Sequence, residues 1–274
     1  MAPCLDVSGV PDDVASEADI DTSFYTKHCS VFGIPVLGSD NVDDDVIKKA
    51  SRLAADMLKD RNDVRDAMHD RFLRILIAAR MQGETLRDLP DLVDLERSDY
   101  AGVGPTPFTP IVAAHDRDVI CRQSTYETVR PGNAFVHEIG HAIHLMGMNF
   151  VDPTFDERLK SAFLNATKVG LWRVVVPADL DGAEDLPALT SRDLTGNDME
   201  RDYLEYWAHG VEIWFQRRSV QVAVRWVDGE SGPILAPAYV GTRAQLRERA
   251  PDLYALLGEA FPSGFVLEPI CAGS

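Results

Sequence analysis

Hydrophobic and polar positions follow two different periods along the chain, and each period predicts a different kind of element. Nearly continuous apolar runs at 33–37 and 72–79 predict buried strands. Acidic residues at 43–45 precede apolar residues spaced three and four apart as far as Lys59, which predicts an amphipathic helix. Glycines and prolines predict a loop over 99–109, and 119–123 has the composition of an edge strand before the next helix.

The C-terminal half favours helices. They are expected over 155–169, after Met199, and over 246–261 with a break at Pro251. The whole pattern predicts an α+β fold, with a small mixed sheet packed on a predominantly helical body. The acidic first 24 residues are expected to form an arm or tail. Residues 25–274 then form a single domain, with an expanded acidic loop at about 174–198.

The stretch 133–147 is apolar almost all round, which predicts a helix buried in the core, with Asn133 as its N-cap and a stop at Gly147. Within it His137, Glu138 and His141 form an HExxH motif. Histidines four residues apart lie on one helix face, so both imidazoles can reach one ion, and Glu138 sits beside that ion to take a proton from water. The alternative is a structural helix whose polar groups are hydrogen-bonded.

A catalytic zinc ion usually takes three protein ligands and a water molecule, so a further ligand is needed. The extended HExxHxxGxxH pattern is excluded, because His144 stands at its glycine position and Gly147 at its last histidine position. Two helical turns separate His144 from His137, about 10 Å at 1.5 Å per residue. We therefore interpret His144 as a core histidine or one that supports the ligands.

The helix expected after Met199 carries a polar stripe opposite an aromatic side. The stripe consists of Asp202, Glu205, His209 and Glu212. Such a stripe is ordinarily a solvated face, but the upstream HExxH makes Glu205 the predicted third metal ligand. His209, one turn later, is predicted to hold Glu205 or to donate a hydrogen bond to an oxyanion, and Asp202 to orient a ligand imidazole.

The two blocks resemble a known family. VHEIGHAIH over 136–144 and EYWAHGVEIWF over 205–215 are similar to the gluzincin zinc peptidases related to the catalytic domain of anthrax lethal factor. The resemblance covers about 24–216 and implies a zincin-like fold. It also implies zinc bound by His137, His141 and Glu205, with Glu138 as the general base.

The chain departs from that family at two positions. His209 stands where the second block of the family ends in glutamate, and Asp198 stands where the family has the tyrosine that stabilises the oxyanion. Another group must then supply this hydrogen bond. His209 ranks first on its spacing from Glu205, ahead of the other donors, which are Tyr203, Tyr126 and Arg173.

These residues predict a zinc-dependent hydrolase that cleaves an amide bond in a peptide or a small amide-containing substrate. One alternative is a zincin-fold metalloenzyme acting on a non-peptide small molecule, which a cleft closed over by 174–198 would favour. The other is a non-catalytic metal-binding protein, which a fourth protein ligand such as His144 would favour. Zinc is the default ion, although iron, manganese or nickel also bind such ligands.

Composition limits the kinds of binding partner and the cellular location that we expect. A formal net charge of −17 argues against nucleic acids and anionic membranes, since both would be repelled. No apolar run approaches the ~20 residues of a membrane helix, and the N-terminus lacks the pattern of a signal peptide, which predicts a cytoplasmic protein unless a leader was removed. The four cysteines, Cys4, Cys29, Cys121 and Cys271, are scattered and expected as free buried thiols, with two disulfides as the alternative in an oxidising compartment.

Overall fold

A computed structural model describes residues 4, 6–96, 100–106, 108–120, 132–173, 198–229, 232–262, 265 and 267. The chain divides into two compact units. Unit 1 comprises 1–125, 133–155 and 260–274, and unit 2 comprises 126–132 and 156–259. The HExxH block therefore belongs to unit 1, whereas the block that begins at Glu205 belongs to unit 2.

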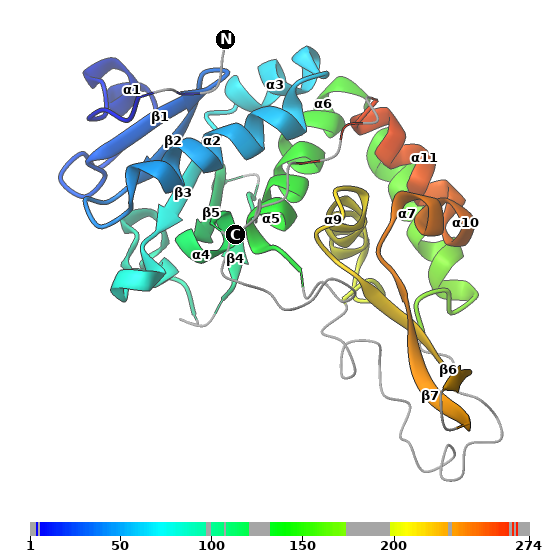
Figure 1. Ribbon diagram of the computed structural model, residues 1–274. Coiled ribbons are helices and arrows are strands. Elements are labelled where there is room, and N and C mark those ends of the chain that lie inside the picture. The colour runs from blue at the N-terminus through cyan, green and yellow to red at the C-terminus, as the bar shows by residue number, and fades with distance from the viewer. Residues whose placement is uncertain are drawn as a thin grey trace. The chain divides into compact units, whose positions relative to one another are not determined.

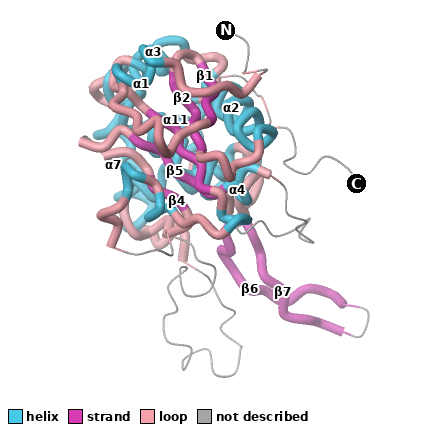
Figure 2. Tube along the Cα trace, turned by 90° about the vertical axis from the view of Figure 1, so that its left-hand side faces the viewer, coloured by secondary structure: helices cyan, strands magenta, loops and turns pink. Residues whose placement is uncertain are grey.

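Unit 1 is built on a five-stranded mixed sheet in the order β1-β2-β3-β5-β4. Its strands are β1 (Lys27–Val31), β2 (Ile34–Gly38), β3 (Arg74–Ala78), β4 (Gly102–Val103) and β5 (Ile111–His115). The pairs β2–β3 and β3–β5 are parallel, whereas β1–β2 and β4–β5 are antiparallel. The short strand β4 is therefore an edge strand of the described sheet (Figure 2).

Helical segments surround this sheet (Figure 1). They are α1 (Asp12–Glu17), α2 (Asp44–Leu58), α3 (Asn62–His69), η1 (Arg80–Gln82), η2 (Leu86–Asp88), η3 (Pro90–Leu92) and α4 (Asp116–Val119). One apolar cluster joins alternate residues of three strands, such as Leu37, Leu76 and Ala113, to Leu86 and Leu89 of the η2–η3 region. Because side chains alternate across a strand, Ile75, Ile77, Val112 and Ala114 are buried on the opposite face.

The HExxH helix α5 (Ala134–Ala142) packs on β5 and β4 and does not stop where the sequence indicated. It continues as the π-helical segment η4 (Ile143–Met148) and as α6 (Asn149–Val151), so the predicted stop at Gly147 is wrong. The reason is packing, because a Cβ atom at Gly147 would lie 2.5 Å from Cγ1 of Val64 on α3. Gly147 permits close contact between two helical segments and does not cap a helix.

Unit 2 is mainly helical, with one hairpin. It contains α7 (Phe155–Lys168, except Phe155), α9 (Tyr203–Trp214), α10 (Arg243–Arg249) and α11 (Pro251–Ala260, except Ala260). The antiparallel strands β6 (Val220–Gly229) and β7 (Gly232–Val240) form a long ribbon with a bulge between Gln221 and Ala223 (Figure 2). A mostly helical C-terminal half was expected and is found, but the sequence reasoning did not predict this ribbon.

The structure differs from the predicted edge strand, the predicted loop and the predicted free thiols. The edge strand expected at 119–123 is wrong at Val119, which ends helix α4, and 121–123 lie outside the described residues. The edge strand is instead β4, within the expected loop. The free thiols expected at Cys4 and Cys29 are also wrong, because these cysteines form a disulfide that ties the N-terminal segment to β1. Cys121 and Cys271 lie outside the described residues.

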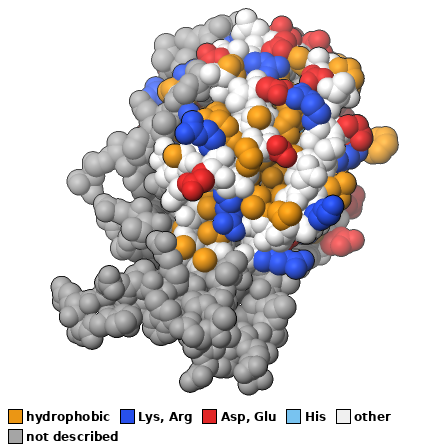
Figure 3. All heavy atoms as spheres, turned by 90° about the vertical axis from the view of Figure 1, so that its right-hand side faces the viewer, with side chains coloured by type: hydrophobic (Ala, Val, Ile, Leu, Met, Phe, Trp, Pro, Cys, Tyr) orange, Lys and Arg blue, Asp and Glu red, His pale blue; other side chains and the backbone are white. Residues whose placement is uncertain are grey.

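The α+β class is confirmed by the mixed sheet and the surrounding helices. Within the described part of the chain, no helix combines the length and the apolar character needed to cross a bilayer. On the side drawn in Figure 3, basic and acidic side chains are interspersed with apolar ones. Among the side chains coloured in that view, residues of both charge signs are present and form no patch of one sign.

Candidate metal centre

Helix α5 begins as the sequence indicated and carries the two histidines on one face. The Asn133 side chain accepts a hydrogen bond from the backbone N–H of Val136 at 2.9 Å, which confirms it as the N-cap. The Nε2 atoms of His137 and His141 are 3.1 Å apart. Ligand atoms of His137, Glu138 and His141 all lie within 4.8 Å of one another, so this group could hold a metal ion.

Strand β4 lies directly against Glu138, a contact that the sequence reasoning missed. A Cβ atom at Gly102 would lie 2.7 Å from Oε1 of Glu138, and one at Gly104 would lie 2.8 Å from Oε2 and 3.1 Å from Cβ of His141. A larger residue at either position would require the Glu138 carboxylate to shift. The detectable signal was the Gly-Val-Gly spacing, since residues two apart in a strand share a face.

Burial gives Glu138 and His141 a largely desolvated setting, with exposed fractions of 8 % and 7 %. A buried carboxylate and a buried imidazole need partners, and a divalent cation would satisfy both at once. His144 is fully buried one turn further on, with its ring centroid 5.8 Å from that of Phe155. The interpretation of His144 as a core histidine is consistent with this packing.

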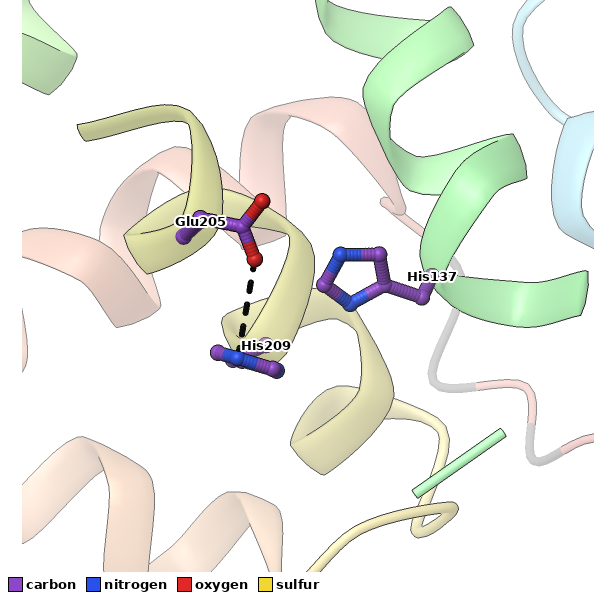
Figure 4. A group of neighbouring side chains, drawn as sticks. All are labelled: His137, Glu205 and His209. Carbon is purple, nitrogen blue, oxygen red and sulfur yellow. Dashed lines mark ion pairs between the residues drawn. The ribbon is translucent and has the colours of Figure 1, made fainter. Parts of the chain in front are cut away.

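Helix α9 holds Glu205 and His209 one turn apart, as the sequence predicted. Asp202 is its N-cap, and one carboxylate oxygen accepts hydrogen bonds from the N–H groups of Leu204 and Glu205, both at 2.9 Å. Orienting a ligand imidazole was the role proposed for Asp202; the contact that the structure shows for it is this helix cap. Glu205 Oε2 lies 3.7 Å from His209 Nε2 (Figure 4, which draws His137 of α5 with these residues).

The other oxygen of Glu205 is held by a basic residue. Nη2 of Arg201, one turn earlier, donates to Oε1 of Glu205 at 2.7 Å. Partial burial alone would lower the pKa of Arg201, but the carboxylates of Glu205, Asp202 and Asp198 outweigh it and raise that pKa. The Arg201 charge therefore stays in place and fixes the carboxylate of Glu205.

A second carboxylate fixes the ring of His209. The Nδ1 atom lies 2.9 Å from Oε2 of Glu212, and that oxygen is 3.5 Å from Nη1 of Arg218. Glu212 is 1 % exposed and His209 is 4 % exposed. Sequence reasoning placed Glu212 in the polar stripe but gave it no role, and its spacing of three from His209 was the available signal.

The other candidates for the oxyanion donor were Tyr203, Arg173 and Tyr126, and the structure describes the contacts of the first two. Tyr203 lies beside α7, with Nζ of Lys160 5.2 Å from its ring centroid. Arg173 is 71 % exposed at its side chain and lies 3.6 Å from Glu200. Tyr126, like most of the acidic loop predicted at about 174–198, lies outside the described residues. The assignment of an oxyanion donor stays a prediction.

The donor sets suit a divalent ion of the zinc type, since imidazoles and a carboxylate are the ligands it takes. His137, Glu138 and His141 belong to unit 1, whereas Glu205 and His209 belong to unit 2. Comparisons with known proteins gave no match to a family model, to a curated protein or to a solved structure. The residues themselves therefore carry the functional argument.

Proposed function

We propose that this protein is a zincin-like, zinc-dependent hydrolase that cleaves an amide bond, with a peptide as the favoured substrate. His137, His141 and Glu205 would bind the ion, and Glu138 would act as the general base. The observation that carries the proposal is the arrangement on α5, where two imidazole nitrogens 3.1 Å apart lie beside a carboxylate that Gly102 of β4 and the following Gly104 approach closely. Zinc remains the default ion.

A bound zinc ion would supply Lewis-acid polarisation of the scissile carbonyl and a lowered pKa for water. Glu138 then has the task of accepting a proton from the attacking water and passing it to the leaving nitrogen. Its carboxylate is suited to this because β4 restricts its position. Pre-set geometry of this kind favours proton transfer, since little reorganisation is required when the reaction occurs.

Strand β4 also favours a peptide over a compact small molecule. It is an edge strand of the described sheet and lies against Glu138. An extended peptide that adds to such an edge would place its own backbone next to the general base. The surroundings of Glu205 support its proposed role as a metal ligand. Arg201 holds one carboxylate oxygen, and the other oxygen, Oε2, is directed towards His209.

The test combines metal analysis with a peptide-library cleavage assay. Glu138→Gln keeps the size of the side chain but removes the base, so we expect it to retain zinc and lose turnover. Glu205→Ala is expected to lose zinc. Glu259→Ala is a matched control, because Glu259 pairs with Arg158 on the helical side of unit 2 and is 45 % exposed at its side chain. Undiminished turnover in Glu138→Gln would remove the general base and refute the proposed mechanism.

A further inference from the structure

We infer that His209 is itself a ligand of the metal ion, paired with Glu205 on α9, and that Glu212 and Arg218 are positioning residues that hold its ring. The inference rests on the metal site of the proposed function. It adds a ligand to that site and gives His209 a different role from the oxyanion donor expected from the sequence.

Spacing on the helix is the first observation. Glu205 Oε2 and His209 Nε2 are 3.7 Å apart, one turn from each other on α9. The corresponding nitrogens of His137 and His141 on α5 are 3.1 Å apart. Two ligand atoms bound tetrahedrally at about 2.0–2.1 Å from zinc are separated by about 3.4 Å, which lies between these values. Each helix thus offers a pair of atoms with a spacing that suits one ion.

The hydrogen-bond partners of the ring are the second observation. Nδ1 faces the Glu212 carboxylate at 2.9 Å, and a carboxylate accepts, so the proton is assigned to Nδ1. The backbone N–H of Asp198 points at Nε2 at 3.3 Å, which requires a lone pair on that nitrogen. A neutral ring of this tautomer has no N–H at Nε2 to offer an oxyanion. It does have the lone pair that a metal ligand needs, and the ion would replace the long contact with Asp198.

The carboxylate that orients the ring is itself anchored. Glu212 is 1 % exposed, and Nη1 of Arg218 lies 3.5 Å from the same Oε2 atom that faces His209. Gly132 makes room for this pair, since a Cβ atom there would lie 2.5 Å from Nη1 of Arg218 and 3.0 Å from Oε1 of Glu212. Metal-binding histidines almost always donate their other ring N–H to such a group, which fixes the orientation of the ring.

His209 would bring the ligand set to three histidines and one glutamate. Zinc can take a fifth ligand during catalysis, so a water molecule can still bind beside four protein ligands, whereas four protein ligands without turnover would match the non-catalytic alternative. The number of zinc ligands and the catalytic turnover can therefore be measured separately on the same protein preparation.

The experiment is X-ray absorption at the zinc edge on the zinc-loaded protein, which counts imidazole ligands by their multiple-scattering signal. We expect three imidazoles in the unaltered protein and two in His209→Ala. Zinc affinity is measured in parallel by competition with a chromophoric chelator. Glu212→Gln should weaken it by about 10- to 100-fold, and His209→Ala should weaken it further.

His69→Ala is the matched control, because His69 also lies near a carboxylate, with Nδ1 3.4 Å from Asp70, but belongs to neither helix of the site. Its zinc affinity should match that of the unaltered protein. If His209→Ala does not fold, Glu212→Gln still decides the question. Two imidazoles in the unaltered protein, or unchanged affinity in both variants of α9, would overturn the inference. If the spectrum shows two imidazoles and turnover depends on Glu138, the ligand role of His209 is refuted and the proposed function stands. If it shows three imidazoles and the protein has no turnover, the ligand role stands and the proposed function is refuted.

Discussion

Gly104 lies against the carboxylate of Glu138, so that a Cβ atom at residue 104 would come within 2.8 Å of Oε2. Gly102 makes the same kind of approach to Oε1 from two residues earlier in the chain. The edge strand β4 and the segment directly after it thus limit the space that the proposed general base occupies. This relationship leads to the most specific mutational prediction.

Gly104→Ala should lower kcat while zinc stays bound. The added methyl group forces the Glu138 carboxylate to move, and a displacement of about 1 Å at a reacting group can cost roughly 100-fold in rate. Cleavage kinetics and zinc content are measured together on the same preparation. Gly9→Ala is the control, because nothing lies within 4 Å of the Cβ position at Gly9. An unchanged kcat in Gly104→Ala would show that Gly104 does not position the base.

Asp202→Ala should destabilise the start of α9 without removing zinc. The side chain accepts two backbone hydrogen bonds, and loss of such an N-cap typically costs about 1 kcal/mol. Urea unfolding of Asp202→Ala and Asp202→Asn measures this, with asparagine expected to retain most of the stability because it also caps well. Loss of zinc in the asparagine variant would instead support the role in orienting a ligand imidazole.

The free energy of unfolding should decrease as the pH falls below about 6.5. Burial, reinforced by the positive charge of Arg117, lowers the pKa of His115 below the ordinary value of 6.5. The unfolded chain therefore binds a proton at His115 where the folded chain does not, so stability is lost as the pH falls and is fully present above 6.5. One such group contributes a slope of at most about 1.4 kcal/mol per pH unit.

His28 shifts in the same direction through burial, so the slope belongs to both histidines. Replacing His115 by Gln should flatten the dependence between pH 5 and 6.5 without abolishing it. Denaturant unfolding at a series of pH values gives the comparison. An identical slope in the variant would show that His115 is not the group responsible.

The elements predicted with confirmed bounds have strong periodicity or clear caps. The helix at 43–59 appears as α2, the strand at 72–79 as β3, and the break at Pro251 separates α10 from α11. The strand β5 was missed because its sequence, IVAAH, is short and contains two alanines, which have weak strand preference. The disulfide and the continuation through Gly147 depend on contacts distant in sequence, which local patterns do not contain.

His137 and His141 followed from spacing, because four residues make about one helical turn whichever fold surrounds it, whereas Glu205 followed from the need for a third ligand and from the family resemblance. Their supporting residues did not. The roles of Gly102, Gly104 and Gly132 depend on which side chains approach them in space. The partners of Glu205 and His209 could have been predicted from the sequence, since Arg201 lies four residues before Glu205 and Glu212 lies three residues after His209.

The central claim is that His137, His141 and Glu205 bind the same ion. The most direct measurement is a crystal structure of the zinc-loaded protein with anomalous data collected on both sides of the zinc edge. We predict a single anomalous peak at about 2.0–2.2 Å from a nitrogen of each histidine and from a carboxylate oxygen of Glu205. No peak at His137 and His141, or a peak there with Glu205 outside the coordination shell, would contradict the account.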